Sequence, residues 1–275
     1  MGSLTNFAET ELMDHIFNGQ DGAGSVYTPP ATVYLALFTS DPTDAGTATS
    51  EPTGNNYIRK AITFGAASGR SITQSGQVTY DQAGGAWGTI SHWGLMTAET
   101  NGNMLAHGQF AVSKQVVSGN TPSVATSEVV VSATADVGMS NYLAVKILDF
   151  LFRNQAFTPP ATYVALCTAN PGDTSTGTTI TEPSGNNYSR KQVDHVAGSS
   201  PTWTAAGATT GLVDNTHAIT FATPSGTWGS ITGVAIVDAG TVGNLLFYEI
   251  DVTDQTPDNG DTVQFAIGAL DVTLD

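Results

Sequence analysis

The sequence predicts a mainly β protein built from two tandem β-sandwich domains, each preceded by a short N-terminal α-helix. Three observations lead to this fold class. An ordered set of motifs occurs twice along the 275 residues. Short segments rich in β-forming residues follow one another, separated by Gly, Ser and Asn turns. Charged residues make up only 12% of the chain and Gly is abundant at 30 residues, which favours strands and turns over long charged helices.

The internal repeat organises the chain. Its longest motif, Glu51–Lys60, returns as Glu182–Lys191. Three shorter motifs recur in the same order: Thr28–Thr32 as Thr158–Thr162, Trp87–Ile90 as Trp228–Ile231, and Gly102–Leu105 as Gly243–Leu246. The repeat predicts a first domain over residues 1–135 and a second over residues 136–275.

Each copy opens with a predicted helix. In copy one, Asn6 is the expected N-cap and Glu9 follows at the third helical position, as in a capping box. In copy two, Ser140 or Asn141 is the expected cap. Apolar residues at helical spacing form one stripe on each helix: Phe7, Leu12, Ile16 and Phe17 in copy one, and Tyr142, Ile147, Leu148, Leu151 and Phe152 in copy two. The Pro-Pro steps at 29–30 and 159–160 end the helices and begin extended chain.

Short strands are expected after each Pro-Pro step, because β-branched and aromatic residues gather between turn residues. The expected strands are Val33–Thr39, Ala61–Phe64, Gln77–Tyr80, His92–Met96, Met104–Val112 and Glu128–Ser132 in copy one, and Tyr163–Thr168 and Thr262–Leu274 in copy two. In the last of these the alternation changes phase near Gly268, which predicts a bulge or a bend there.

Charge and hydropathy exclude several classes of partner. The net charge of −16 and the pI near 4.3 repel phosphate backbones, so no nucleic-acid partner is expected. No segment approaches the ~18 apolar residues of a membrane span. The N-terminus lacks the basic and apolar regions of a secretory signal, which predicts synthesis in the cytoplasm without export. The single cysteine, Cys167, allows no intrachain disulfide.

The duplication also tests for catalysis, because an ancestral active site kept in both copies would place its residues at matching positions. None of the five histidines recurs in this way. No nucleophile elbow, Walker loop, HExxH or CxxC spacing is present. We therefore predict no catalytic residue, no metal, no cofactor and no enzyme activity. The acidic run near Asp258 could hold calcium in a loop, although a solvated acidic hairpin is the preferred interpretation.

The segment that both copies keep supplies the candidate contact and turn residues: Glu51, Asn55, Asn56, Tyr57 and Arg59, with Glu182, Asn186, Asn187, Tyr188 and Arg190. The preferred interpretation is a loop lock, in which Asn-Asn adopts a left-handed turn and each Arg braces the Glu of its copy. The alternative is an exposed Tyr and Arg patch that contacts a partner or a sugar. Trp87 and Trp228 are predicted in the core. Trp93 and Trp203 lack counterparts and are the candidate surface aromatics, although burial stays the preferred interpretation for both.

As an ordered set, these motifs resemble phage virion proteins of the tail-fibre-like or minor tail type. The motifs are the helix followed by Thr28–Thr39, then Gly54–Arg59, Trp87–Ile90, Gly102–Leu105 and the ending Gly260–Leu274. The resemblance covers nearly the whole chain, once per copy, and copy one departs from it at Thr121–Val124. It implies a structural, non-enzymatic virion component whose partners are other virion proteins, and homo-oligomerisation is expected at symmetric particle positions.

Four functions stay open at the level of sequence, and the first is a tail-associated assembly or adhesion protein of tail-fibre or tail-tip type. The second is a capsid decoration, or cement, protein that stabilises the head. The third is a carbohydrate-binding module for a host-surface glycan, which would need Trp93, Trp203 or the Tyr57 and Tyr188 pair as an aromatic platform. The fourth is a glycan-degrading enzyme, for which only Glu51 and Glu182 offer duplicated carboxylates.

Overall fold

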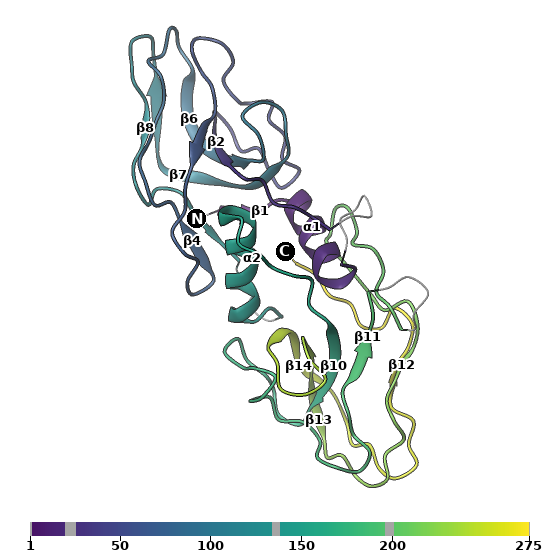
Figure 1. Ribbon diagram of the computed structural model, residues 1–275. Helices are drawn as coiled ribbons and strands as arrows, with labels where there is room; N and C mark the ends of the chain where they lie inside the picture. The colour runs from purple at the N-terminus through teal and green to yellow at the C-terminus, as the bar shows by residue number, and fades with distance from the viewer. Residues whose placement is uncertain (1, 20–25, 134–137, 196–200, 275) are drawn as a thin grey trace.

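The computed structural model describes residues 2–19, 26–133, 138–195 and 201–274. The chain is elongated, with one β-rich lobe at each end and both helices, α1 (Asn6–Phe17) and α2 (Asn141–Arg153), between them (Figure 1). Lobe one holds β1 (Gly2–Leu4), β2 (Val33–Phe38), β3 (Lys60–Ile62), β4 (Ser71–Thr73), β5 (Val78–Thr79), β6 (Gly88–Met96), β7 (Met104–Val116), β8 (Ser123–Val124) and β9 (Val130–Ser132). Lobe two holds β10 (Thr162–Cys167), β11 (Lys191–Val193), β12 (Ile219–Thr220), β13 (Ile231–Val237), β14 (Leu245–Gln255) and β15 (Gln264–Phe265).

Lobe one is a sandwich of unequal layers. Its large sheet has the strand order β3-β2-β6-β7-β1-β9-β4, and the second layer is the pair β5-β8. The Tyr80 hydroxyl, just after β5, donates to the Leu35 carbonyl of β2 over 2.8 Å and ties the two layers together. Apolar side chains of β2 are buried on both faces of the strand, as expected for the centre of a domain.

Lobe two repeats the central part of this plan with fewer strands. Its sheet order β11-β10-β13-β14 corresponds to β3-β2-β6-β7, and the pair β12-β15 corresponds to β5-β8. An antiparallel bridge between Val213 and Val272 stands where Ile72 of β4 pairs with Val131 of β9 in lobe one. The fold is therefore mainly β, with two tandem domains, as predicted.

The two helices are exchanged between the lobes. The α1 helix begins on lobe one, where the Thr5 N–H donates to the Leu105 carbonyl over 3.1 Å. It ends on lobe two, where Phe17 packs edge-on against Trp203 with ring centroids 4.8 Å apart. The α2 helix runs the opposite way.

At its start, α2 is attached to lobe two, because the Ser140 N–H donates to the Leu246 carbonyl over 2.9 Å. At its end, the ring of Phe152 packs on Phe64 of lobe one at 5.4 Å. Each helix thus joins its own lobe to the other one. Amphipathic helices bury their apolar stripe wherever a matching surface exists, and here that surface is shared by both copies.

Equivalent residues of the two helices make equivalent contacts. Asp14 of α1 accepts a hydrogen bond from the Ala206 N–H of lobe two at 2.6 Å, and Asp149 of α2 accepts one from the Ala67 N–H of lobe one at 2.9 Å. The ring of His15 lies 4.6 Å from the ring of Phe150, its counterpart in the other helix. Counterparts that touch each other lie on a twofold axis, so the two copies are arranged with pseudo-twofold symmetry.

One apolar cluster runs through both lobes and includes both helices. Leu12 and Phe17 of α1 and Leu148 and Leu151 of α2 are all fully buried within it. An ion pair of 2.8 Å between Arg70 and Asp173 adds a polar contact between the lobes. The predicted domain boundary between residues 135 and 136 lies outside the described residues.

The helix caps agree with expectation in one copy only. Ser140 caps α2, since its hydroxyl accepts from the Leu143 N–H at 3.2 Å. The prediction of Asn6 as the cap of α1 is wrong: Thr5 is the cap and Asn6 is the first helical residue. Thr5 is favoured because its hydroxyl accepts from Ala8 and also donates to the Met104 carbonyl, which fixes the helix start to β7.

The last predicted strand of copy two is interrupted. Only Gln264 and Phe265 form a strand, and the chain then bends at Gly268, whose φ is 63°. A bend at this position was predicted, but the continuous strand from Thr262 to Leu274 was not correct. The buried side chain of Asn215 accepts hydrogen bonds from the backbone N–H groups that follow Gly268, and this holds the turn in place of sheet pairing.

Candidate functional site

The Gly-Asn-Asn segment forms the same left-handed turn in both lobes. In lobe one φ is 68°, 51° and 64° for Gly54, Asn55 and Asn56. Asn tolerates this region better than other non-Gly residues, because its side chain bonds locally to backbone. The Asn56 side chain donates to the Gln82 carbonyl at 3.0 Å, and the Trp87 indole donates to the Asn55 carbonyl, also at 3.0 Å. In lobe two φ is 71°, 50° and 66° for Gly185, Asn186 and Asn187.

Tyr57 leads from this turn into the interior of lobe one. Its hydroxyl donates to Glu51 at 2.8 Å and accepts from the Leu37 N–H of β2 at 2.9 Å. Its ring stacks on Tyr80, with centroids 6.0 Å apart, and meets Trp87 edge-on. Burial, followed by the neighbouring Glu51 carboxylate, raises the pKa of Tyr57 far above its usual value, so the phenol stays neutral.

Arg59 completes the arrangement from the position just before β3. Its guanidinium binds Glu51 through two parallel hydrogen bonds of 2.8 and 2.7 Å. The remaining terminal nitrogen donates to the carbonyls of Ala98 at 3.0 Å and Asn101 at 2.5 Å. Arg59 is only 7% exposed, and its hydrogen bond to Glu51 is the main cause that raises its pKa. We call Glu51, Tyr57 and Arg59 the brace of lobe one.

The brace of lobe two, Glu182, Tyr188 and Arg190, has the same geometry. The Tyr188 hydroxyl donates to Glu182 at 2.7 Å and accepts from the Leu166 N–H at 2.9 Å. Arg190 pairs with Glu182 at 2.7 Å. It also donates to the carbonyls of Ala239 at 2.8 Å, Val242 at 2.7 Å and Gly177. Burial again raises the pKa of Tyr188 far above its usual value.

Each brace ties three loops to the centre of its sheet. The ion pairs that the sequence suggested, Arg59 with Glu51 and Arg190 with Glu182, are present. The polar atoms of these side chains are occupied by one another and by backbone carbonyls, so the brace holds loops and offers little surface for chemistry. Glu51 and Glu182 lie in separate lobes, each bound to an arginine, and do not form a pair across one cleft.

Trp93 and Trp203, the candidate surface aromatics, are both buried, so the surface alternative is wrong. Trp93 is completely buried in β6, because its indole lies against Gly2 of β1 and Gly108 of β7, where the absence of side chains makes room for the ring. Trp203 is 4% exposed, donates to the Thr162 hydroxyl at 2.9 Å and packs against Phe17 of the exchanged helix. Glycine opposite tryptophan on neighbouring strands was the available signal for Trp93. Trp87 and Trp228 are buried, as predicted.

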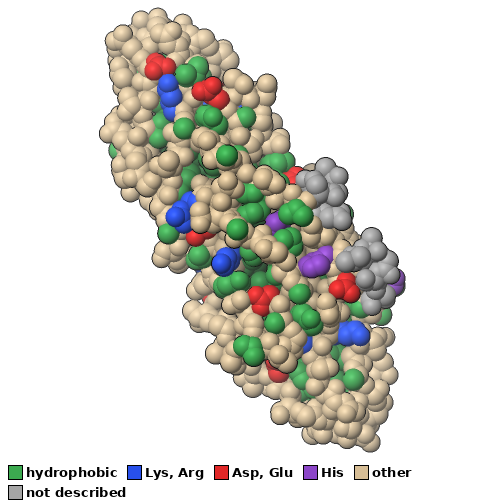
Figure 2. Space-filling model, viewed as in Figure 1, with side chains coloured by type: hydrophobic (Ala, Val, Ile, Leu, Met, Phe, Trp, Pro, Cys, Tyr) green, Lys and Arg blue, Asp and Glu red, His purple; other side chains and the backbone are tan. Residues whose placement is uncertain are grey.

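The acidic run near Asp258 forms a turn. The Asp261 carboxylate accepts from the Asp258 N–H at 2.8 Å, and Asp258 accepts from the Asn259 N–H at 2.7 Å. Among the described residues, no group of three or more His, Cys, Asp or Glu side chains is arranged to hold a metal ion. On the face shown in Figure 2, Lys and Arg side chains are scattered singly and form no basic patch.

A known protein family matches each copy of the repeat. Residues 3–132 and, separately, residues 138–273 match the family described as podophage GP4 fiber I protein gp80. The chain belongs to this family. The match runs once over each copy, which agrees with a tail-fibre-like protein present as two tandem copies. On this basis the chain is a structural tail component of a phage virion, where other virion proteins are its neighbours.

No curated protein matches the chain. The comparison therefore rests on the family model, which spans both lobes and both helices. In the part of the chain that the structure describes, neither helix is long and apolar enough to cross a membrane.

Proposed function

We propose that the chain is a non-enzymatic assembly element of a podophage tail fibre, which binds neighbouring virion proteins and forms a homo-oligomer. The observation that carries the proposal is the family match over both copies. The fold supports it, since two lobes that share exchanged helices and one core form a stiff building block, with two loop-covered ends for contacts.

The non-enzymatic part of the proposal rests on the two braces. Glycoside hydrolysis needs two carboxyl groups that face the same substrate bond. Glu51 and Glu182 are instead held by Arg59 and Arg190 in separate lobes. A carboxylate fixed by a bidentate arginine and a tyrosine hydroxyl is poorly suited to act as a general acid or nucleophile, because both its oxygens are already engaged.

Adhesion to a host glycan has less support than assembly. Sugar binding by an aromatic platform requires exposed ring faces. Trp93 and Trp203 are buried, and the Tyr57 and Tyr188 rings stack inside their lobes. The candidate residues of the sequence therefore do not provide such a platform. Capsid decoration has no support from the family description, which names a fibre.

Immunogold labelling of purified particles, combined with quantitative mass spectrometry, tests the proposal. We expect label at the tail and a copy number per particle far below that of the major capsid protein, whose own antibody is the control. Label over the head would replace the proposal with capsid decoration, and absence of label from all particles would contradict both. Native mass spectrometry of the pure protein tests the homo-oligomer, which a purely monomeric spectrum would contradict.

A further inference from the structure

The loop between β2 and β3, residues 39–50, lies on the face of the lobe-one sheet opposite the main core. Phe38, Met96 and Met104 form a separate buried apolar cluster on that face. Gly46 of the loop packs directly on this cluster, since a Cβ added at Gly46 would stand 3.2 Å from the Cβ of Met104. Residues 39–50 thus form a strap across the cluster, and we call them strap one.

A single histidine of β7 links strap one to the sheet. The Nε2 atom of His107 lies 2.8 Å from a carboxylate oxygen of Asp44, and its Nδ1 atom lies 3.1 Å from one of Asp41. An ionised carboxylate only accepts hydrogen bonds, and a neutral imidazole carries one N–H and one lone pair. The ring can therefore present an N–H to both aspartates only as the imidazolium ion. We call His107, Asp41 and Asp44 the clamp.

The clamp also fixes the start of α1. The Asp44 carbonyl accepts a hydrogen bond of 3.1 Å from the N–H of Asn6, the first residue of the helix. The Asp41 carboxylate accepts one of 2.9 Å from the N–H of Thr43, whose φ is 60°. A β-branched residue in this left-handed region is strained, so the turn needs contacts that hold it. Strap one and the exchanged helix α1 thus depend on the same two aspartates.

The elements around the ring of His107 bring few other titratable groups. Ser3 of β1 and Gly94 of β6 stand opposite it in the sheet and carry no charge. His92, two residues before Gly94 on the same face of β6, is bonded at 2.8 Å to the hydroxyl of the serine that precedes it. Glu9, in the first turn of α1, lies against lobe two. In the described part of the chain, the aspartates of the clamp are therefore the carboxylates that contact the ring.

The counterpart in lobe two is strap two, residues 168–181, which is held by a tyrosine. Tyr248 stands at the position of His107, and its hydroxyl donates to a carboxylate oxygen of Asp173. The other oxygen of Asp173 forms the ion pair between the lobes, and its carbonyl accepts from the Asn141 N–H of α2 at 2.9 Å. Burial, followed by the hydrogen bond to Asp173, raises the pKa of Tyr248 to about 12, so this phenol keeps its proton near neutral pH.

We propose that the clamp is a pH-sensitive device, which holds strap one and the start of α1 while His107 is an imidazolium ion and loosens them when the ring gives a proton to solvent. Loss of the proton turns a lone pair toward one carboxylate and removes the charge that attracts both. The two carboxylates are 53% and 59% exposed, so the effect is that of a partly exposed ion pair. Strap two stays closed, which confines the response to lobe one. This device is independent of the proposed function.

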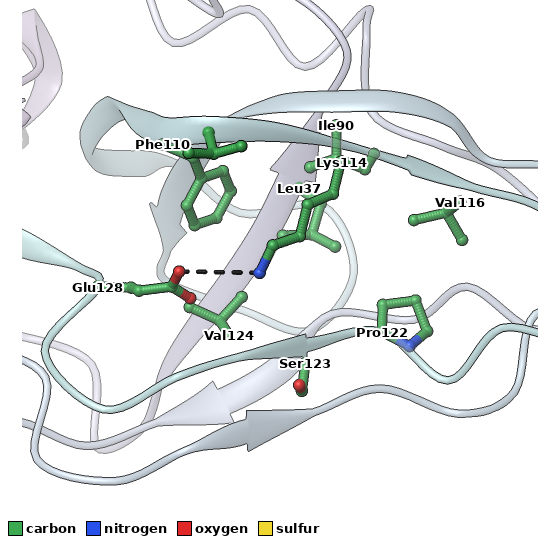
Figure 3. Close-up of a pocket in the computed structure, with 10 residues that line it drawn as sticks. Leu37, Ile90, Phe110, Lys114, Val116, Pro122, Ser123, Val124 and Glu128 are labelled. Atoms are coloured by element: carbon green, nitrogen blue, oxygen red, sulfur yellow. Dashed lines mark ion pairs between the residues drawn. The ribbon is translucent and has the colours of Figure 1, made fainter.

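A second ion pair on the same strand provides a matched control. Lys114 of β7 lies 3.8 Å from Glu128 across a hollow lined mainly by apolar side chains (Figure 3). Lysine and glutamate ordinarily keep their charge in the pH range where histidine titrates. Glu128→Gln therefore removes an ion pair from β7 without changing the clamp.

Hydrogen exchange of the full chain tests the clamp, with protection factors corrected for the intrinsic pH dependence of exchange. Between about pH 5.5 and about pH 8.5, we expect the protection of the Thr47 and Asn6 amides to fall about threefold. The Asn141 amide of lobe two is the matched position, and it should keep its protection. His107→Tyr, which copies lobe two, should abolish the pH dependence at Thr47. Glu128→Gln should retain that pH dependence.

Nitrogen NMR of the wild-type chain gives a second measurement, which needs no variant to fold. It reports whether both ring nitrogens of His107 carry a proton. We expect the imidazolium ion at about pH 5.5, and loss of one proton in step with the fall in Thr47 protection. A neutral ring at about pH 5.5 would overturn the proposal. Protection at Thr47 that is independent of pH, equal losses at Thr47 and Asn141, or an undiminished pH dependence in His107→Tyr would each overturn it as well.

Discussion

Lobe one and lobe two hold their braces with the same geometry but fill the space between their sheet strands differently. In lobe one Trp93 of β6 lies under Gly2 and Gly108 and is fully buried. In lobe two Val234 occupies the equivalent position on β13, opposite Leu166 just as Trp93 is opposite Leu37. A cavity lined by Val234 and its neighbours on β14 remains there. The difference teaches that the loop-holding ion pairs and the apolar packing of this fold vary independently.

Both lobes share the brace, and the sharpest test of it is to remove the charge of its glutamate. Glu51→Gln leaves the Arg59 guanidinium buried without its counter-ion, and breaking a buried pair in this way costs about 3–5 kcal/mol of unfolding free energy. Glu182→Gln should cost a similar amount, because Arg190 is equally buried. Urea denaturation of the two variants measures both values. A loss below about 1 kcal/mol in either lobe would show that the brace is not a stabilising element.

The apolar packing differs between the lobes, and this difference can be tested by giving lobe one the valine that lobe two carries at the position of Trp93. Trp93→Val removes most of a fully buried indole and leaves a cavity, which should lower the unfolding free energy by about 3 kcal/mol. The matched variant Val234→Ala enlarges a cavity that already exists, so we expect a smaller loss, of about 1–2 kcal/mol. Equal losses of unfolding free energy, measured by the same urea titration, would contradict the different packing of Trp93 in lobe one and Val234 in lobe two.

The exchange of helices predicts equal roles for two aspartates. Asp14→Ala and Asp149→Ala each remove a charged acceptor from a backbone N–H of the opposite lobe and should cost about 2 kcal/mol. Thermal unfolding of the single and double variants measures the two effects. A cost in only one of the two lobes would show that the pseudo-twofold contact is energetically one-sided.

The smallest effect concerns the axis, where His15 meets Phe150. Burial lowers the pKa of His15 below its usual value of 6.5. When the pH falls below the usual pKa, His15 binds a proton in the unfolded chain but not in the folded chain, so the free energy of unfolding decreases. The decrease ends when the pH reaches the lower pKa of the folded state. One such proton accounts for at most about 1.4 kcal/mol per pH unit. His15→Phe, which copies position 150, should lose less stability between about pH 7 and about pH 5.5 than wild type. An identical pH dependence would contradict this assignment.

Much of the fold could be predicted because the information was local. Turn residues and alternating apolar residues located most strands, and the repeated Glu-to-Arg spacing predicted both ion pairs of the brace. The helix exchange could not be predicted in this way. An apolar stripe on residues such as Leu12 and Phe17 shows that a helix is buried, but it does not show which lobe covers it. The burial of Trp93 depended similarly on Gly2 and Gly108 in two other strands, and only the pairing of these strands shows that both glycines face the indole.

The exposure of Val112 was missed for a related reason. Val112 lies in a predicted strand, where apolar residues alternate toward the core, yet its side chain is 69% exposed. The register between β6 and β7 shifts between Ile90 and His92, which interrupts the regular alternation of β7 in this region. The residues themselves carry no signature of this shift.

A tail fibre carries mechanical load, and the exchanged helices determine where that load passes. A force that pulls the lobes apart must draw α1 out of lobe two and α2 out of lobe one, against apolar packing and the Asp14 and Asp149 hydrogen bonds. The load is then distributed over two buried helices that point in opposite senses, rather than concentrated on the single peptide connection between the copies. Separation of the lobes under force would therefore require both helices to leave the opposite lobe at the same time.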